Sequence, residues 1–387
     1  MKKIAWLSLS SLLLAVVLNS CSKDHAPSIP NYTVPTTYNF TNFNDSGSLK
    51  LLLMADQIVA KINTGNTIPH TVVNAQQLKD MFNNVNGNFT DSSLKLNGCG
   101  LRLADYTSAA ATTDLMNYFD SIGIYSQSAA SASPGVPGVV ASSVSANKKF
   151  LLSPNGVFFS QVVKKLIHGG VAQYSINRLL TDSISSSVDN NTVVAGSGTA
   201  MEHHWDLAFG FFGAPVNFPT VTTGLKYLAS YSNQVEAGLG SNEKIMNAFL
   251  KGRAAISAKD MNTKQAQATI NMKTLDSLDA AAIVQEMKET DANIEAGDAV
   301  AAYGTLSEAL GFVRNLKYNT SPTRAITDAQ YNQLLALFDS VNPGSPNLYI
   351  FVNANVSTKA QIEAKTDAIR QFIGKVYGFT VTQLAAQ

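Results

Sequence analysis

Residues 200–213 read AMEHHWDLAFGFFG and place two acids and two histidines within five positions, in a chain with only five histidines. On a helix, Glu202 and Asp206 are four residues apart and share a face with His203, whereas His204 points to roughly the opposite side. One imidazole with one or two carboxylates suits iron, manganese or zinc. We therefore expect that His203, Asp206 and Glu202 can bind a divalent metal such as iron or zinc, with further ligands from elsewhere in the fold.

The same segment also fits a structural role. Trp205, Phe209, Phe211 and Phe212 make it rich in aromatic side chains, so most of this helix should be buried. Buried acids and histidines need hydrogen-bond partners, and the dipole favours an acid such as Glu202 near a helix start. A helix whose polar residues are held inside the core therefore remains the alternative to a metal or ligand site.

Arg253 is the second residue that could do chemistry, because it projects from the apolar face of a helix expected over residues 242–257. A buried arginine costs several kcal/mol unless it is paired, so an acid must lie next to it. The expected partners are Asp206, Glu202 and Glu308. The arginine could form a structural salt bridge, or it could bind a carboxylate or phosphate of a ligand.

Glu308 lies at the edge of the apolar stripe of its own helix, one turn before Phe312. It could be an ordinary flanking acid or a ligand that faces His203. His168, by contrast, falls opposite the apolar stripe of its helix and is expected at the surface. The Gly169-Gly170 pair after it should permit close helix packing or a kink.

Helical periodicity dominates the segments that must position these residues. An all-α fold is expected, with about ten helices in two packed bundles joined by long loops. The loops are predicted at Ser126–Lys149 and Thr181–Thr199, and residues 347–353 (NLYIFVN) are the one segment that reads as a strand. Helices are expected from residue 49, over 158–180, 242–257, 266–295, 302–316, 327–339 and 358–377.

The N-terminus has the form of a lipoprotein signal peptide. A short basic start and an apolar run to Leu18 lead to Asn19-Ser20-Cys21, which resembles a lipobox. Cleavage before Cys21 would leave this cysteine acylated and would hold the protein on a membrane. Cys99 then has no cysteine to pair with and is expected to be a small buried side chain. The predicted organisation is a signal peptide over 1–20, a tether and strap over 21–45, and bundles over 46–199 and 200–387.

Composition narrows the functional classes. The formal net charge is +1 and only 14% of residues are charged, without a basic patch, so nucleic acid is not an expected partner. The zinc-protease pattern His-Glu-x-x-His is absent from the sequence, as are a phosphate-binding glycine loop and a Cys-x-x-Cys motif. These observations favour a binding protein over an enzyme.

Four segments in this order resemble the exported Bacteroidetes lipoproteins of domain-of-unknown-function family 4856, which are similar in architecture to imelysin-like helical bundles. The segments are YTVPTTYNFTNFNDSGSLKLLLMADQI, MEHHWDLAFGFFGAP, AFLKGRAAI and LSEALGFVRNLKYN. The resemblance runs from about residue 31 to the C-terminus. Imelysins carry a Gly-x-His-x-x-Glu motif, in which His203 and Asp206 would take the places of the histidine and the glutamate, while Met201 replaces the glycine.

The resemblance implies a protein anchored to the outer membrane, on the periplasmic or the cell-surface side, that works in iron, haem or other metal acquisition with outer-membrane uptake machinery. An imelysin-like metallopeptidase or other hydrolase is the first alternative. A surface glycan-binding lipoprotein is the second, and it would need exposed aromatic side chains.

Overall fold

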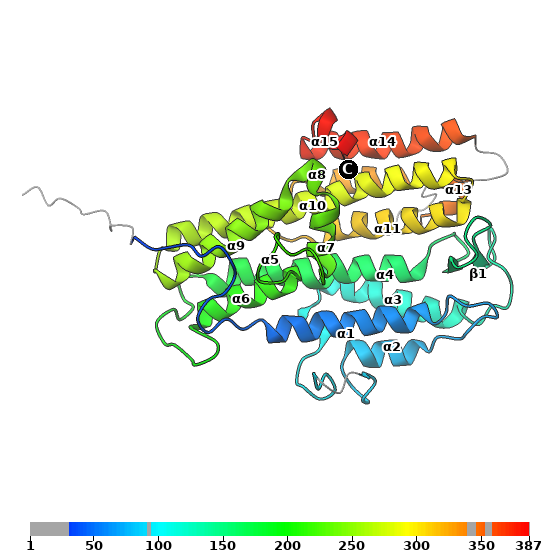
Figure 1. The fold of residues 1–387 in the computed structure, drawn as a ribbon. Helices are drawn as coiled ribbons and strands as arrows, with labels where there is room; N and C mark the ends of the chain where they lie inside the picture. Colours follow the sequence, from blue (N-terminus) through cyan, green and yellow to red (C-terminus); the bar gives the residue numbers. More distant parts are fainter. Residues whose placement is uncertain (1–30, 91–93, 339–345, 353–357, 387) are drawn as a thin grey trace, which may run out of the picture. The chain divides into compact units, whose positions relative to one another are not determined.

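The computed structural model describes residues 31–90, 94–338, 346–352 and 358–386, and it is mostly helical, with long loops and one two-stranded sheet. The all-α prediction is therefore confirmed. Figure 1 shows α1, α4, α10, α11 and α14 lying side by side with nearly aligned axes. The elements are α1 Ser46–Asn63, α2 Ala75–Phe82, α3 Ala109–Tyr125, β1 Gly138–Ala141, β2 Lys149–Leu152, α4 Phe159–Ile167, α5 Tyr174–Thr181, α6 Ala200–Phe212, α7 Tyr227–Gln234, α8 Glu236–Leu239, α9 Ser241–Ser257, α10 Met261–Glu295, α11 Ala299–Tyr318, α12 Asp328–Ala336, α13 Leu348–Phe351, α14 Lys359–Tyr377 and α15 Val381–Ala386.

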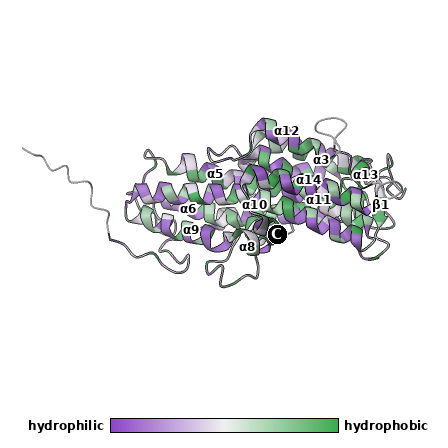
Figure 2. Ribbon diagram, turned by 90° about the horizontal axis from the view of Figure 1, so that it is seen from above, coloured by the Kyte–Doolittle hydropathy of each residue, from purple (hydrophilic) through white to green (hydrophobic). Residues whose placement is uncertain are grey.

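The long helix α10 organises the centre, because it packs against α9, α11 and α14, and α11 in turn packs against α4. Aspartates mark the starts of both helices: Asp260 accepts a hydrogen bond from Thr263 N, and Asp298 accepts one from Ala301 N. Such caps satisfy amide groups that a helix start leaves unpaired. Hydrophobic and hydrophilic residues alternate along the helices, which lets each helix bury one side (Figure 2).

A π-helical turn joins α4 to α5 at His168–Gln173, hereafter the π-turn. The expected helix over 158–180 is thus continuous in direction but interrupted by this wider turn. Glycines allow the close packing that the sequence predicted there. A Cβ atom on Gly169 would lie 2.1 Å from Asn315 Cγ, and one on Gly170 would lie 2.3 Å from Ala111 Cβ. The π-turn is therefore clamped between α3 and α11.

The segment before α1, residues 31–44, lies on the body as a strap. Tyr38 is buried and stacks on Phe209 with ring centroids 3.9 Å apart, and its backbone N–H donates to Val216 O over 2.8 Å. Phe40 and Phe43 pack edge-on against the same tyrosine. Aromatic contacts thus attach the strap to α6.

Three local predictions are wrong. Residues Leu348–Phe351 form the short helix α13 rather than a strand, since Asn347 caps two of their amides. The expected loop over 126–149 contains β1, which pairs antiparallel with β2 in the register Val139 with Leu151. His168 is fully buried rather than at the surface, because the face of α4 that carries it, together with Lys165, is covered by α10 and α11.

The predicted boundary between two bundles at residues 199 and 200 does not interrupt the packing. Residues Tyr32–Gln387 form one compact unit, and α6 packs against α1 and α5 across this boundary. Cys99 is partly buried. The signal peptide, Cys21 and most of the tether lie outside the described residues. Within the described ranges, no helix is both long and apolar enough to cross a membrane.

Candidate functional site

Arg253 lies at the centre of a buried ionic cluster between α6 and α9, hereafter the Arg253 centre. Its Nε donates to Asp206 Oδ1 over 2.8 Å and its Nη1 donates to Glu202 Oε1 over 2.6 Å. The side chain is only 1% exposed, and its guanidinium lies 5.1 Å from the ring centre of Phe40. The expectation that Arg253 meets Asp206 and Glu202 is thus confirmed in geometry.

Neighbouring groups complete the hydrogen bonds of the two carboxylates. Asp206 Oδ1 also accepts from the Tyr38 hydroxyl over 3.0 Å. Glu202 forms a capping box with Thr199 and accepts a second hydrogen bond from Ser257 Oγ over 2.6 Å. The Arg253 centre therefore joins the strap, α6 and α9 through charge-assisted hydrogen bonds.

The pKa values of the two acids of this centre are shifted in opposite directions. Burial raises the pKa of Asp206 to about 6 and outweighs the charge and hydrogen bonds of Arg253 that lower it. For Glu202, burial also raises the pKa, but hydrogen bonds from Ser257, Thr199 and Arg253 together with the charge of Arg253 outweigh it and lower the pKa below its usual value. Glu202 is thus the better-solvated and better-paired partner of the arginine.

Neither histidine of the motif forms a hydrogen bond with Arg253, Asp206 or Glu202 among the described residues. Burial lowers the pKa of His203, and the neighbouring His204 lowers it further. His204 Nδ1 lies 2.7 Å from Ser183 O. Both carboxylates turn to Arg253, whose positive charge occupies the place that a cation would take, so this set does not fit a metal ion. Across the described part of the chain, no group of three or more His, Cys, Asp or Glu side chains is arranged to hold a metal ion.

Glu308 does not join the Arg253 centre, so its expected pairing with Arg253 is wrong. It accepts a hydrogen bond from Lys165 Nζ over 2.8 Å and another from the Tyr231 hydroxyl over 3.0 Å. Lys165 is fully buried, and its Nζ lies 4.8 Å from the ring centre of Tyr231. These residues and Glu286 form a second buried ionic cluster between α4, α7, α10 and α11, hereafter the Lys165 centre.

The two carboxylates of the Lys165 centre share one positive charge. Burial raises the pKa of Glu286 well above its usual value, and the charge of Glu308 raises it further. Burial also acts on Glu308, but the charge and hydrogen bond of Lys165 and the hydrogen bonds of Glu286 and Tyr231 outweigh it and lower its pKa. Glu308 therefore loses its proton more readily than Glu286 and is the ionic partner of Lys165.

A sequence signal for this centre existed in α11, where Glu308, Gly311, Phe312 and Asn315 follow helical spacing along one face. Gly311 leaves room for the lysine, because a Cβ atom there would lie 2.4 Å from Lys165 Cβ. Asn315 packs on the π-turn from the same face. The spacing thus indicated a polar stripe facing α4, whereas its partners on α4 and α10 could not be identified from α11 alone.

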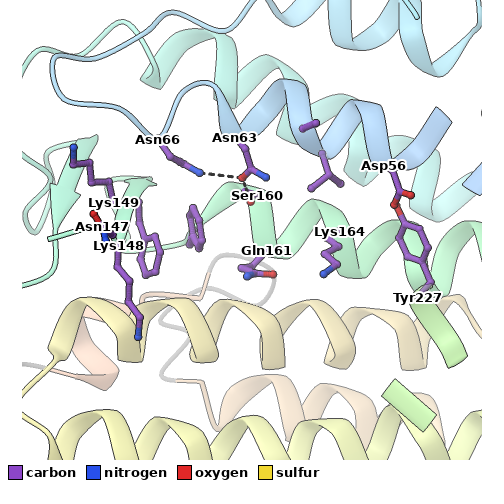
Figure 3. A pocket seen from close by; sticks show the side chains of 14 residues that line it. Asp56, Asn63, Asn66, Asn147, Lys148, Lys149, Ser160, Gln161, Lys164 and Tyr227 are labelled. Carbon is purple, nitrogen blue, oxygen red and sulfur yellow. Dashed lines mark hydrogen bonds between the residues drawn. The ribbon is translucent and has the colours of Figure 1, made fainter. Parts of the chain in front are cut away.

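An open groove runs along α4, on the side of that helix that faces α1 and the β-hairpin. It has a volume of about 500 Å³. Figure 3 shows its labelled side chains in a row, from Asn147, Lys148 and Lys149 of the hairpin, past Gln161 and Lys164 of α4, to Asp56 and Tyr227 at the other end. No sequence motif marks this groove, because its lining comes from α1, the hairpin, α4 and α7.

The groove is positively charged and rich in hydrogen-bonding groups. Lys148, Lys149 and Lys164 line it, and none of the three forms an ion pair with a carboxylate of the described residues. Its one acid, Asp56, is already paired with Lys226. Amides and a hydroxyl supply the remaining polar lining, from Asn63, Asn66, Asn147, Gln161 and Ser160.

Partial burial and the charge of Lys165 lower the pKa of Lys164. Lysine ammonium groups without partners attract anions, and amides can both donate and accept hydrogen bonds. The chemistry of the groove therefore suits an anionic ligand that also carries hydroxyl or carbonyl groups.

These features of the described residues define an all-α protein with two buried ionic centres and an open polar groove along α4. The family model of the domain of unknown function DUF4856 matches residues 35–380. The chain belongs to this family, as its motifs predicted. No curated protein and no solved structure matches the chain.

Proposed function

We propose that this protein is a non-enzymatic binding component that takes an anionic ligand into the groove along α4. The observation that carries the proposal is the set of three lysines without carboxylate partners around a space of about 500 Å³. In metal acquisition, the matching ligand is an iron chelate that carries carboxylates, such as haem or ferric citrate, rather than a bare ion. Lys148, Lys149 and Lys164 would bind the carboxylates, and the amides would orient the chelate.

The rival functions lack such support. A metallopeptidase needs a bound metal with an open coordination position, and no suitable ligand group occurs in the described ranges. Glycan binding through aromatic platforms would need exposed rings. Trp205 is fully buried and donates to Phe249 O, and Phe158 of the groove is buried beneath Phe150.

Calorimetric titration of the purified full-length chain tests the proposal. The probes are haem, ferric citrate, citrate alone and a sulfated oligosaccharide. The double variant Lys148→Ala/Lys149→Ala should bind the preferred probe about tenfold more weakly, because two charge-assisted contacts of about 0.7 kcal/mol each are lost. Added salt should weaken binding to the wild type by screening the same charges.

The matched control is Lys251→Ala/Lys273→Ala, which removes two exposed lysines of α9 and α10 far along the sequence from the groove lining. This control should bind like the wild type. Binding that is equal in both double variants would overturn the groove as the site. Binding of the sulfated oligosaccharide alone would keep an anion site but overturn the role in metal acquisition.

We further propose that Cys21 is acylated and anchors the protein to the outer membrane. The support is the signal-like segment that ends at Asn19-Ser20-Cys21. Cys21→Ser should move the protein from the membrane fraction to the soluble fraction, whereas Cys99→Ser should leave it on the membrane. Retention of Cys21→Ser in the membrane fraction would contradict the anchor.

A further inference from the structure

The groove along α4 ends at α7 in a tyrosine with a strained backbone. Tyr227 is the first residue of α7, and its φ angle of 40° lies in the left-handed region that bulky residues rarely adopt. It is 5% exposed and forms part of the groove lining. Strain of this kind persists only where the surrounding structure enforces it, and it is concentrated at ligand-binding sites. The strain therefore directs attention to this end of the groove.

The connection from α6 to α7 holds Tyr227 in this conformation. Lys226 N donates a hydrogen bond to Gly213 O over 2.9 Å. Gly213 has a φ angle of 83°, and a Cβ atom there would lie 2.6 Å from Lys226 O, so glycine permits this close approach. The side chain of Lys226 pairs with Asp56 of α1. These contacts join α1, the end of α6 and the start of α7 at one end of the groove.

The hydroxyl of Tyr227 is directed at the carboxylate of Asp56 (Figure 3). Burial raises the pKa of Tyr227 well above its usual value, and the charge of Asp56 and a hydrogen bond to it raise this pKa further. The hydroxyl therefore keeps its proton and donates it to Asp56. Tyr227 and Lys226 together fix the orientation of this carboxylate, whose side chain is 40% exposed.

Asp56 differs in chemistry from the rest of the groove lining. Lysines only donate hydrogen bonds and amides both donate and accept, whereas an ionised carboxylate only accepts, at about four positions. Two donors on Asp56 therefore leave acceptor positions for a ligand. Lys226 balances the charge of Asp56, and the charge of Asp56 also acts on the neighbouring Lys164. This end of the groove thus suits a neutral donor, such as a hydroxyl group, rather than a cation.

The groove is long enough to select for the length of a ligand. Asp56 and Asn63 both line it and lie on the same helix, separated by about 10 Å at a rise of about 1.5 Å per residue. Lys148 and Lys149 lie beyond Asn63, at the hairpin end of the row (Figure 3). A ligand that contacts both ends must therefore be longer than about 10 Å.

We propose that Asp56, positioned by Tyr227 and Lys226, selects an elongated hydroxycarboxylate, with a carboxylate at one end and hydroxyl groups at the other. This inference rests on the proposed function of the groove as an anion site. The ligand carboxylate pairs with Lys148 and Lys149, and a ligand hydroxyl donates to Asp56. Among iron chelates, complexes of sugar acids and other hydroxycarboxylates match this arrangement better than haem, which carries carboxylates but no hydroxyl group.

Calorimetric titration of the full-length chain with lactobionate and with suberate tests the inference. Lactobionate is a sugar acid with one carboxylate and a hydroxylated ring at its far end, whereas suberate has a carboxylate at each end. The wild type should bind lactobionate about tenfold more tightly, although lactobionate carries the smaller charge. Asp56→Asn should bind lactobionate about tenfold more weakly than the wild type does. It should bind suberate at least as tightly as the wild type, because Lys226 becomes free to pair with the second carboxylate.

Tyr227→Phe tests the positioning role, because it removes the hydroxyl that donates to Asp56. The ratio of lactobionate to suberate affinity should fall by about threefold. Tyr38→Phe is the matched control, since the hydroxyl of Tyr38 also donates to an aspartate, Asp206, over 3.0 Å, but lies outside the groove lining. Its ratio should equal that of the wild type, whatever its effect on stability.

The outcomes separate this inference from the function on which it rests. Equal affinities of the wild type for both probes, or a ratio that neither Asp56→Asn nor Tyr227→Phe changes, would overturn the selection by Asp56 and leave the groove as an anion site. Failure of both probes to bind, or binding that Lys148→Ala/Lys149→Ala does not weaken, would overturn the anion site and the inference with it. Retained suberate binding by Asp56→Asn also shows that this variant is folded.

Discussion

The Arg253 centre and the Lys165 centre have the same composition, one buried cation with two carboxylates, but they distribute the charge differently. Arg253 reaches Asp206 and Glu202 at once, through Nε and Nη1. Lys165 donates to Glu308, while burial and the charge of Glu308 raise the pKa of the second acid, Glu286. The planar fork of arginine can bind two acids in fixed geometry, whereas the ammonium of lysine is a compact point charge.

The difference indicates separate structural roles. The Arg253 centre joins the strap to α6 and α9 through Tyr38, near the start of the body. The Lys165 centre lies between α4 and α11, next to the groove residue Lys164 and to His168 of the π-turn. One centre therefore attaches a peripheral segment, and the other lies between the groove and the core.

Arg253→Met should have the largest effect. It leaves Asp206 and Glu202 buried without their cation, so the free energy of unfolding should fall by about 3–5 kcal/mol. Urea-induced unfolding at pH 7 measures the change. Lys251→Met, on the exposed side of the same helix, is the control and should change stability by less than about 0.5 kcal/mol. A loss below about 1 kcal/mol in Arg253→Met would mean that the Arg253 centre does not stabilise the fold.

The second largest effect should be the pH dependence that Asp206 gives to the folding stability. Its folded pKa of about 6 lies above the ordinary value of 3.8, so the folded chain binds this proton more tightly than the unfolded chain. The resulting stabilisation is complete below about pH 4 and is lost as the pH rises through about 6. A shift of about two pKa units corresponds to about 3 kcal/mol.

The stability advantage of the wild type over Asp206→Asn should therefore shrink by about 3 kcal/mol between pH 4 and pH 7, measured by urea unfolding at each pH. Carbon-13 NMR of the Asp206 carboxyl group gives the pKa directly. An advantage that stays constant or grows with pH would show that Arg253, rather than burial, controls this acid.

The smallest change in stability is expected for substitutions of the two acids of the Lys165 centre. Glu308→Gln removes the charged partner of Lys165 and forces Glu286 to ionise, so it should cost about 2 kcal/mol. Glu286→Gln replaces the acid whose raised pKa favours the neutral form, so it should change stability by less than about 0.5 kcal/mol. Thermal unfolding of both variants at pH 7 measures the difference. Equal losses would mean that the two acids share the charge of Lys165 evenly.

Sequence reasoning predicted much of the fold but only part of the site. Periodicity located the long helices, and an arginine on an apolar face predicted its own acidic partners, because a buried charge cannot remain unpaired. The same reasoning placed His168 at the surface, because it took the polar side of α4 for an exposed face, whereas α10 and α11 cover that side. It also assigned Glu308 to Arg253, since a sequence does not give distances between helices.

Local spacing and the cost of burying a charge were enough to predict the all-α class and the pairing of Arg253 with Glu202 and Asp206. The folded structure was needed to place His203 and Glu308 outside that pairing, and to bring Lys148, Lys149 and Lys164 to one groove. The physical reason is that the groove and the Lys165 centre are built from segments distant in sequence, whose pairing depends on how α1, α4, α10 and α11 pack.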